Sequence, residues 1–502
     1  MKIFTAAQIR ACDAYTVHAS AISSVELMER AASKCLDWIS SNYSKDTLFV
    51  ILCGPGNNGG DGLAITRMLN HVGYGAKAFL LKFSENLSAD CQTNLERLQR
   101  MDAALVQILE PDSFITDIPA NIVILDAILG TGLSRPTQGW VATFIEHINQ
   151  LPNRKIAIDI PSGLPSDGIP AKDAAIINAS NTLSFQFYKR SFLHPETGPY
   201  VGNVHILDIG LHPIFIESTH TLYNITDAQE IKKIYRPRNP FAHKGTYGHA
   251  LMIGGSYGKM GSITLSSKAA LRAGAGLVTA LIPACGYDII QTAIPEVMCK
   301  TSGEKEITDI NDWEAYRAIG IGPGMDTKDV TAKAFAEFIE ACKQPLVIDA
   351  DALNLLAKQA HLLASLPPGS IITPHPKEFS RLFGESADSM LQLELARAQA
   401  MRYNIYIVLK GHHTVIVTPD GECWYNNTGN AGMAKGGSGD VLTGIITGLF
   451  AQGYDARDAA IFGVYLHGLA GDIAAANFSQ EAMLASDIIK SLGMVFMRIR
   501  EN

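Results

Sequence analysis

The stretch "LFVILCGPGNNGGDGL", Leu48 to Leu63, runs from an apolar segment through a glycine-rich turn into a helical pattern. Further short apolar segments occur at 76–81, 121–127 and 155–160, with helical patterns between them. Apolar strands that alternate with amphipathic helices predict a parallel sheet with helices on both faces. We therefore expect the first half of the chain to form a three-layer αβα sandwich.

The glycine-rich turn has the spacing G-x-G-x-x-G between Gly54 and Gly59, which is also the spacing of a dinucleotide-binding fingerprint. That fingerprint needs an acidic residue at the end of the next strand, about 20 positions on, where this chain has Lys82. Asp61 would also repel a phosphate bound at the turn. A P-loop would need Lys and Ser or Thr where Gly60 and Asp61 stand. Neither motif explains the turn.

The composition of the whole chain is that of a soluble globular protein. Its 502 residues predict two to four domains. The 44 glycines favour an α/β protein with many ligand-binding turns over a helical bundle. The formal net charge of −8 argues against a nucleic-acid-binding surface. The sequence has no run of 18 apolar residues, and its charged first 17 residues predict neither a signal peptide nor a membrane span.

The eight cysteines form no C-x-x-C pair. They indicate reduced thiols, mostly buried, rather than a disulfide framework or a zinc site. We therefore expect a cytoplasmic protein that binds small molecules, forms a homo-oligomer, and has no nucleic-acid or membrane partner.

The alternation of strands and helices stops after residue 211, and residues 212–226 show no clear period. We predict an N-terminal domain over 1–215, a linker over 216–226 and a C-terminal domain over 227–502. In the second domain the segments at 248–256, 345–351, 369–376 and 405–417 predict strands, and those at 261–276 and 439–453 predict helices. The second domain is therefore also expected to be α/β, and no internal repeat links it to the first.

Polar side chains follow three strands of the first domain. Asn58 comes after the first strand, Asp126 after "NIVIL", and Ser162 after "KIAIDIP". The carboxyl ends of parallel strands lie side by side, so these oxygens are expected to come within reach of one another. Amide, carboxylate and hydroxyl oxygens are ligands for a hard cation. The alternative is that they are ordinary turn residues and helix caps.

Four motifs of the first half resemble the NAD(P)H-hydrate epimerase domain. They are "GPGNNGGDGL" (54–63), "DAILGTGLSRP" (126–136), "DIPSGL" (159–164) and "GNVHILDIGL" (202–211). The resemblance spans nearly all of 1–215 and implies a Rossmann-like fold. It implies a substrate that is a damaged, hydrated nicotinamide dinucleotide, whose two epimers at the hydrated ring carbon are interconverted. The loop after Leu164, "PSDG", is shorter than family members usually carry.

The resemblance also implies roles for individual residues. It implies that Asn58, Asp126 and Ser162 hold a potassium ion. Asp159 becomes the candidate acid/base, because a carboxylate beside the reacting ring moves protons when its pKa is tuned. Lys189 is a second candidate, although a surface lysine explains this residue at least equally well. The implied substrate contacts are Asn57, Asn58, Gly59, Gly60, Asp61, Gly130, Thr131, Gly132, Leu133, Ser134, Arg135, Pro136 and Asp159.

The second domain has its own glycine-rich loop, within "GNAGMAKGGSGDVLTGIITGLFAQG" (429–453). Gly436, Gly437 and Gly439 precede an apolar helix that is expected to start at Asp440. Backbone N–H groups of such a loop and the helix dipole favour an anion there. A carboxylate facing the same anion is costly unless it takes part in proton transfer. The alternative is that Asp440 is simply the N-cap of the helix.

This loop resembles the G-x-G-D signature of the ribokinase-like kinases. Further motifs at 243–279, 321–325, 349–354 ("DADALN"), 373–379 ("TPHPKEF") and 409–416 ("LKGHHTVI") narrow the resemblance to the NAD(P)H-hydrate dehydratase. The resemblance implies that Gly324, His375 and Asp440 contact the hydrate. It implies that the nucleotide meets Lys410, Gly411, His412, His413, Thr414 and Gly439. His375 between two prolines is alternatively a packed turn residue, and the two histidines after Gly411 depart from the family's smaller residues.

The chemistry implied by the second resemblance is phosphorylation followed by elimination. Asp440 helps the ring hydroxyl attack the terminal phosphoryl group of a nucleotide, and loss of phosphate restores the ring double bond. ADP is the implied donor, with AMP and phosphate released, ATP is an open alternative, and magnesium is expected for phosphoryl transfer. Together the two domains predict a bifunctional enzyme that repairs hydrated NADH and NADPH. The rivals are a vitamin-precursor kinase in the second domain and a non-catalytic binding module in the first.

Overall fold

The computed structural model describes residues 1–115, 118–133 and 135–501, which form two compact units. One unit comprises Lys2–Thr221, and the other begins at Leu222 and also takes in Met1. Residues 216–226, expected as a linker, contain the end of α7 (Pro213–Ser218) and all of β8 (Tyr223–Thr226). Because β8 pairs with β17 in the second unit, this stretch contributes a strand to the C-terminal sheet.

The N-terminal unit has a seven-stranded sheet in the order β3-β2-β1-β4-β5-β6-β7, and every neighbouring pair is parallel. The strands are β1 (Leu48–Cys53), β2 (Gly75–Leu81), β3 (Val106–Leu109), β4 (Val123–Ala127), β5 (Lys155–Ile158), β6 (Asn181–Phe185) and β7 (Asn203–Leu207). Chain order reverses at β1, which lies between β2 and β4. Ligands of open α/β sheets bind outside the carboxyl ends of the strands at such a point.

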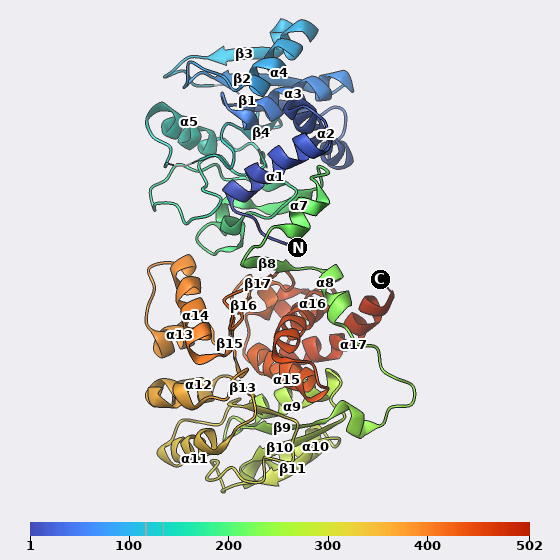
Figure 1. Ribbon diagram of the computed structural model, residues 1–502, viewed down its shortest axis with the longest axis vertical. Coiled ribbons are helices and arrows are strands. Elements are labelled where there is room, and N and C mark those ends of the chain that lie inside the picture. The colour runs from blue at the N-terminus through green and yellow to red at the C-terminus, as the bar shows by residue number, and fades with distance from the viewer. Residues whose placement is uncertain (116–117, 134, 502) are drawn as a thin grey trace. The chain divides into compact units, whose positions relative to one another are not determined.

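Helices cover both faces of this sheet, as Figure 1 shows. One face carries α1 (Ala6–Ala19), α2 (Ser24–Asn42), α3 (Asn57–His71) and α4 (Ala89–Met101), and the other carries α5 (Gly139–Gln150). A short α6 (Gly198–Val201) precedes β7. Separate clusters of buried apolar side chains fill the two sides of the sheet. The predicted three-layer αβα sandwich is confirmed.

The C-terminal unit has a ten-stranded mixed sheet in the order β11-β10-β9-β12-β13-β14-β15-β16-β17-β8. Its remaining strands are β9 (His249–Ile253), β10 (Leu277–Ile282), β11 (Met298–Thr301), β12 (Ala318–Ile321), β13 (Leu346–Ile348), β14 (Ile371–Ile372), β15 (Tyr406–Leu409), β16 (Val415–Val417) and β17 (Cys423–Asn426). The segment 405–417 folds as two antiparallel strands, β15 and β16. Residues 410–414 therefore form a turn at the end of the sheet rather than part of a strand.

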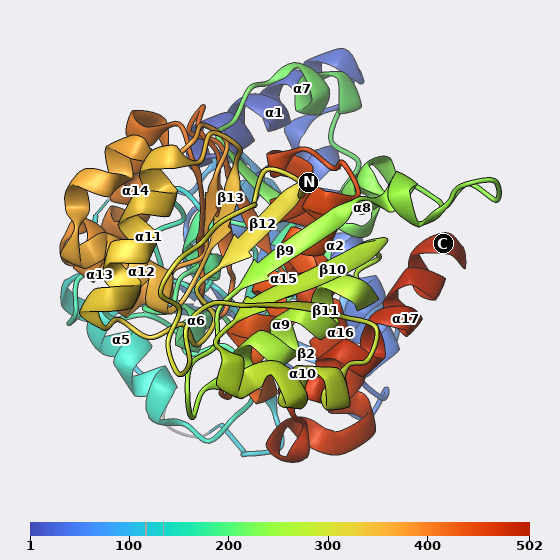
Figure 2. The same cartoon turned by 90° about the horizontal axis from the view of Figure 1, so that it is seen from below.

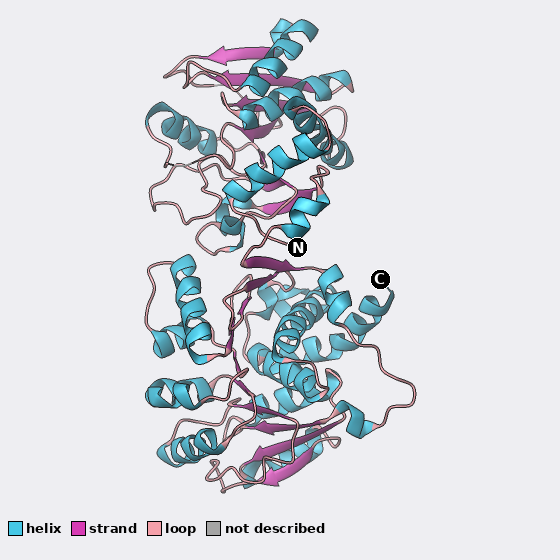
Figure 3. Cartoon of the chain, viewed as in Figure 1, coloured by secondary structure: helices cyan, strands magenta, loops and turns pink. Residues whose placement is uncertain are grey.

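Two layers of helices enclose the C-terminal sheet (Figures 1 and 2). One layer contains α11 (Asp329–Ala341), α12 (Asp351–Lys358), α13 (Pro376–Phe383) and α14 (Ser389–Tyr403). The other contains α9 (Met260–Arg272), α15 (Ser438–Ala451), α16 (Ala456–Ala482) and α17 (Ala485–Glu501), with α8 (Ala228–Ile234) and α10 (Tyr287–Ala293) as shorter additions. Figure 3 shows the strands of each unit lying between helices. Short 3-10 helices lie at Ala103–Leu105, Arg190–Leu193, Lys244–Tyr247, Ala284–Gly286, Ala360–Ser365 and Ala431–Met433.

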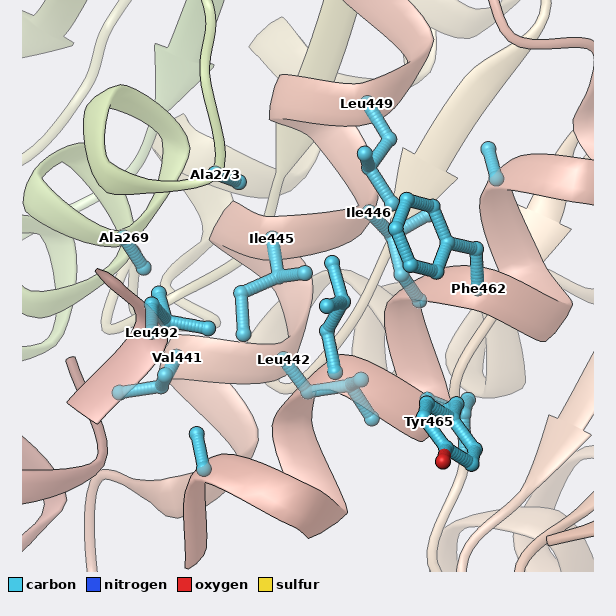
Figure 4. Close-up of a cluster of buried hydrophobic side chains, with 14 of the residues drawn as sticks. Ala269, Ala273, Val441, Leu442, Ile445, Ile446, Leu449, Phe462, Tyr465 and Leu492 are labelled. Atoms are coloured by element: carbon cyan, nitrogen blue, oxygen red, sulfur yellow. The ribbon is translucent and has the colours of Figure 1, made fainter. Parts of the chain in front are cut away.

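The core of the C-terminal unit is built around α15. Val441, Ile445 and Leu449 lie on its buried surface, near Ala269 of α9 and Phe462 of α16 (Figure 4). Among the described helices, α16 is the one that is long and apolar enough to cross a membrane, but 78% of its apolar window is buried inside the protein. Its hydrophobicity is therefore that of a core helix.

Candidate functional sites

The N-terminal unit has a cavity of about 600 Å³ at the carboxyl ends of β1, β4 and β5. It lies at the point where chain order reverses, as expected for a ligand site in this architecture. Its walls come from α1, from the turn before α3, and from the loop after β4. The lining residues include Ile9, Arg10, Asp13, Pro55, Gly56, Asn57, Asn58, Asp61, Ile128, Leu129, Gly130, Thr131, Gly132, Leu133, Arg135 and Asp159.

The glycines of the first turn serve close packing. A Cβ atom on Gly54 would lie 1.9 Å from the Ile128 carbonyl oxygen, and one on Gly59 would lie 1.7 Å from the Gly54 carbonyl oxygen. Both distances are far inside van der Waals contact, so a side chain at either position would force the backbone apart. The turn therefore brings the N-terminus of α3 against the loop after β4, while Gly59 and Gly60 themselves do not line the cavity.

The three residues predicted to hold a cation do come together behind the cavity wall. The Ser162 hydroxyl donates to Asp126 Oδ1 at 2.5 Å, and the Ser162 backbone N–H donates to Asp126 Oδ2 at 2.8 Å. The Asn58 side-chain amide donates to the Leu129 carbonyl at 3.0 Å. Asn58 Oδ1 is buried and accepts no hydrogen bond from any residue that the structure describes. The Leu129 carbonyl also accepts from the Ser162 hydroxyl at 3.2 Å, so this carbonyl links Asn58 to the Ser162–Asp126 pair. A buried oxygen without a donor, linked in this way to a carboxylate and a hydroxyl, has the chemistry of a cation site.

Asp159 and Lys189 form a buried ion pair at the end of β5. Lys189 Nζ lies 2.6 Å from Asp159 Oδ1 and 2.8 Å from Ser184 Oγ, and its side chain is only 1% exposed. The alternative that Lys189 is a surface lysine is therefore wrong. Asp159 also has φ +66°, a backbone conformation that costs energy for a residue with a side chain. Asp159 lines the cavity in this conformation.

Most of the predicted substrate contacts line this cavity, with a few exceptions. Asn57, Asn58, Asp61, Asp159, Arg135 and residues 130–133 line it. Pro136 and the two glycines at 59 and 60 do not, and Ser134 lies outside the described residues. Asp13 of α1 also lines the cavity, although no motif pointed to it. Burial and the nearby Asp159 carboxylate raise the pKa of Asp13 to about 7.

The C-terminal unit has a larger cavity, of about 800 Å³, beyond the ends of β13, β14 and β15 and at the N-terminus of α15. Its lining combines the glycine-rich loop with charged side chains from the ends of three parallel strands. The lining residues include Asp349, Ala350, His375, Glu378, Lys410, Gly411, His412, Thr414, Asn426, Gly436, Gly437, Ser438, Gly439, Asp440 and His467.

A network of polar side chains lies at the base of this cavity. Lys410 Nζ donates to Asp349 Oδ1 at 2.9 Å, and the Thr443 hydroxyl donates to Asp349 Oδ2 at 2.6 Å. Lys410 also lies 3.9 Å from the Glu378 carboxylate. A Cβ atom on Gly439 would meet Lys410 Nζ at 3.4 Å, so the helix N-terminus comes close to the ammonium group. The motif "DADALN" implied no role for Asp349, yet Asp349 is the buried centre of this network.

Asp440 is the third residue of α15 and does not cap it. The N-cap is Gly437, whose φ of +90° favours glycine, and no side chain caps this helix. The alternative that Asp440 is an N-cap is therefore wrong. Burial and the neighbouring Asp349 raise the pKa of Asp440 to about 6, while a hydrogen bond with Ser262 acts in the opposite direction. The carboxylate thus faces the cavity as a group able to take up a proton near neutral pH.

His375 combines a cap with a position on the cavity wall. Its Nδ1 accepts from the backbone N–H groups of Lys377 at 3.1 Å and Glu378 at 3.3 Å, which caps α13. Burial and the Lys410 ammonium lower the pKa of His375, which favours the neutral ring with its proton on Nε2. Its packed position at a helix start and its exposure to the cavity are therefore compatible.

Two further predicted contacts lie away from the cavity lining. His413 directs Nδ1 to the Asn426 carbonyl at 3.1 Å, and burial lowers the pKa of His413 to about 4. Gly324 has φ +65°, and a Cβ there would lie 2.7 Å from the Lys259 carbonyl oxygen and 3.1 Å from Ser262 Cβ. Gly324 thus makes room for the start of α9, which carries the Ser262 hydroxyl to Asp440.

These two units define a class of protein, a two-domain α/β enzyme with an independent site in each domain. A family model described as NAD(P)H-hydrate dehydratase matches residues 250–493, and one described as YjeF-related protein N-terminus matches residues 24–191. The bifunctional NAD(P)H-hydrate repair enzyme of Moorella thermoacetica is 36% identical over 100% of this chain and 98% of its own length. The corresponding enzyme of Escherichia coli is 34% identical over 93% of this chain and 88% of the length of the Escherichia coli protein.

The chain therefore belongs to the family of bifunctional NAD(P)H-hydrate repair enzymes. It is an NAD(P)H-hydrate epimerase and dehydratase in one polypeptide, as the motifs predicted, and this assignment decides against both rivals. A solved ADP/ATP-dependent NAD(P)H-hydrate dehydratase from Bacillus subtilis, co-crystallised with ATP and Mg²⁺, is 32% identical. The match covers 55% of this chain and 98% of the Bacillus subtilis chain, with a TM-score of 0.49.

Proposed function

We propose that the N-terminal cavity interconverts the R and S hydrates, and that the C-terminal cavity dehydrates the S hydrate with ADP as phosphoryl donor, releasing AMP and phosphate. A dehydratase selective for one epimer leaves half of a mixed pool unless the epimers interconvert, so the two reactions complement each other. The observation that supports this proposal most is the position of Asp440, in the first turn of α15 beside the Lys410–Asp349 pair.

In the C-terminal cavity, Asp440 accepts the proton of the ring hydroxyl while the oxygen attacks the terminal phosphoryl group of ADP. The bond from that phosphorus to the bridging oxygen breaks, and AMP leaves. The N–H groups of residues 437–439 and the Lys410 ammonium neutralise the charge of the phosphoryl oxygens. The resulting phosphate ester then loses phosphate and a ring proton, and the double bond of the reduced nicotinamide is restored.

Magnesium is proposed as the partner of the nucleotide. Among the described residues, no cluster of three or more His, Cys, Asp or Glu side chains could hold a metal ion by itself. Mg²⁺ in phosphoryl-transfer sites is commonly held by substrate phosphates with only one or two carboxylates, which agrees with this cavity. The Bacillus subtilis relative, crystallised with ATP and Mg²⁺, supports the same assignment.

A potassium ion is proposed at Asn58, Asp126 and Ser162. The unpartnered Asn58 Oδ1, and the Leu129 carbonyl that links Asn58 to the Ser162–Asp126 pair, support this assignment. When bound, the ion would supply positive charge beside the cavity that Asn58 lines. Asp159 is proposed as the acid/base, and Lys189 orients its carboxylate through the 2.6 Å ion pair.

The proposed dehydration is tested by supplying the hydrate with each nucleotide separately. The S hydrate of NADH is incubated with the protein, Mg²⁺ and either ADP or ATP, and absorbance of the reduced nicotinamide is followed. We expect recovery with ADP and one AMP per NADH formed, measured by chromatography. Absence of recovery with both nucleotides would refute the proposal, and recovery with ATP alone would refute ADP as the donor.

The potassium site is tested by exchanging the ion and by removing one ligand. Replacing K⁺ by choline is expected to slow epimerisation at least tenfold, because the oxygens at Asn58 and Asp126 lose their cation, while dehydration of the S hydrate is unchanged. An Asn58→Ala variant is expected to lose the response to K⁺, and Asn86→Ala, an exposed change, to keep it. An equal rate of epimerisation in K⁺ and choline would count against the site.

A cytoplasmic location is also proposed, and it is supported by the eight free cysteines, six of them buried. A homo-oligomer stays a prediction from the sequence, and light scattering would measure it.

A further inference from the structure

Asp13 is a carboxyl group on the wall of the epimerase cavity to which no motif assigned a role. Helix α1 buries Ile9, Cys12 and Thr16 against the domain, a spacing that defines one face of a helix. Asp13 lies four residues after Ile9 on the edge of that face, and Ile9, Arg10 and Asp13 all line the cavity. The helix thus delivers a carboxyl group to the site from outside the sheet.

Burial and the Asp159 carboxylate raise the pKa of Asp13 more than the Lys189 ammonium lowers it. The Asp13 carboxylate makes no hydrogen bond or ion pair with any described residue, although it is only partly exposed. Two further carboxylates, Asp61 and Asp159, line the same cavity, and Lys189 is already paired with Asp159. A desolvated carboxylate beside like charges costs folding free energy. Groups held at such a cost are characteristic of catalytic sites.

Epimerisation at the hydrated ring carbon requires proton transfer twice. The hydroxyl group leaves one face of the ring and returns to the other, so one group must donate a proton and another must accept one. We propose that Asp13 is the second catalytic carboxyl group of the epimerase, acting from the α1 wall while Asp159 acts from the end of β5. This inference rests on the function proposed for the N-terminal cavity.

Asp13 and Asp159 would each transfer one proton in the reaction. Protonated Asp13 donates its proton to the hydroxyl oxygen, the carbon–oxygen bond breaks with both electrons moving to oxygen, and water and a ring iminium cation form. Water then adds to the opposite face of the carbon, and Asp159 takes the released proton. The opposite epimer has formed, and the proton returns from Asp159 to Asp13 through solvent. The pKa of Asp13, about 7, leaves a large protonated fraction at neutral pH.

The pH dependence of the step follows from the groups that face Asp13. Asp159 and Lys189 act on the Asp13 carboxyl directly, and Asp13 acts in turn on Asp61 of α3. Arg10 and Arg135 line the same cavity. Protonated Asp13 is the active form, so the rate of epimerisation is expected to fall as pH rises above about 7. A side chain at position 13 that does not titrate should therefore give a rate of epimerisation that no longer falls above pH 7.

The test uses the full-length protein and the R hydrate of NADH without any nucleotide, so that only epimerisation proceeds. Chromatography measures the formation of the S hydrate between pH 5.5 and 9. Asp13→Asn is expected to lower kcat at least about 100-fold, to change KM less than threefold, and to abolish the fall in rate above pH 7. Asp37→Asn, an exposed carboxyl on α2, is the matched control and should behave as wild type.

Two further measurements separate the possible failures. Calorimetry and R-hydrate binding establish that Asp13→Asn is folded and still recognises the substrate. A rate within threefold of wild type, an unchanged pH profile, or a loss of rate matched by an equal loss of binding would each overturn the inference. The Asp159→Asn variant is assayed in parallel. If Asp159→Asn retains epimerisation while Asp13→Asn loses it, the proposed role of Asp159 fails while that of Asp13 stands.

Discussion

Carboxylates in the two cavities fall into those with a cationic partner and those without one. Asp159 lies 2.6 Å from Lys189, and Asp349 lies 2.9 Å from Lys410. Asp440 forms no ion pair with a described residue, and burial and Asp349 raise its pKa to about 6. An ammonium neighbour fixes the position of a carboxylate, whereas the buried Asp440 carboxylate, which has no such neighbour in an ion pair, can exchange a proton near neutral pH.

The raised pKa of Asp440 predicts the pH dependence of dehydration. The carboxylate must be deprotonated to accept the hydroxyl proton, so kcat is expected to fall about tenfold per pH unit below pH 6. An Asp440→Asn variant is expected to lose about 100-fold or more of kcat and to keep epimerisation. Stopped assays with saturating S hydrate and nucleotide between pH 5 and 8 measure both.

Asp329→Asn is the control for this prediction, because Asp329 is also an acid in the first turn of a helix but is exposed on α11. It should keep the profile of the wild type. A dehydration rate that stays constant down to pH 5 would contradict the assignment of Asp440 as the base.

At the scale of elements, α15 combines two requirements that compete in most helices. Its N-terminus lines the C-terminal cavity, and it also packs very closely against α9 through glycines. A Cβ atom on Gly444 would lie 2.1 Å from the Ser266 carbonyl oxygen, and one on Gly448 would lie 2.5 Å from that of Ala270. Glycine inside a helix lowers intrinsic helix stability by about 1 kcal/mol relative to alanine, so close packing must explain its presence.

Gly444→Ala is therefore expected to destabilise the C-terminal unit although alanine is the better helix former. The overlap with α9 should lower the free energy of unfolding by about 1–3 kcal/mol, as overpacking of a core does. It should also lower kcat for dehydration, because α15 carries Asp440. Denaturant titration followed by circular dichroism measures the stability.

Gly493→Ala provides the matched comparison, because this exposed glycine lies within α17 and an added Cβ would meet nothing within 4 Å. That substitution is expected to raise stability by about 0.5–1 kcal/mol. Equal effects at the two positions would show that the contact with α9 is not the reason for the glycine.

At the scale of the whole molecule, the two cavities lie in units with separate sheets and separate cores. Each site is complete within its own unit, so we expect the two reactions to be separable by point substitution. In an equal mixture of the two hydrates, the Asp159→Asn variant should dehydrate only the S half during the rapid phase of the reaction. Adding the Asp440→Asn variant should restore recovery of the whole pool.

Absorbance of reduced nicotinamide with ADP and Mg²⁺ measures this recovery, and each variant alone is the control. Recovery that stops at half after the two variants are mixed would show that the hydrate must pass between sites of one chain. Recovery of the whole pool by Asp159→Asn alone would show that this carboxylate is not needed for epimerisation.

The sequence was sufficient for the fold class and for much of each candidate site, because both depend on local signals. Apolar segments followed by glycine-rich turns mark strand ends, and parallel strands bring those ends together. Asn58, Asp126 and Ser162 were therefore predicted as a group, and the structure brings them together. Asp13 was missed because its signal is the orientation of a helix against the domain, which no local pattern records.

By itself the sequence determined the two α/β domains, the family and the loops that carry the chemistry. The tertiary structure decided what each polar residue can do there. Lys189 is a buried partner of Asp159 rather than a surface lysine, and Asp440 lies inside its helix rather than at the cap. Asp349 is the centre of the second site because the fold brings Lys410, after β15, and Thr443, of α15, against the end of β13. The physical reason is that charge, burial and pKa depend on neighbours distant in sequence, whereas periodicity and turn chemistry depend on adjacent residues.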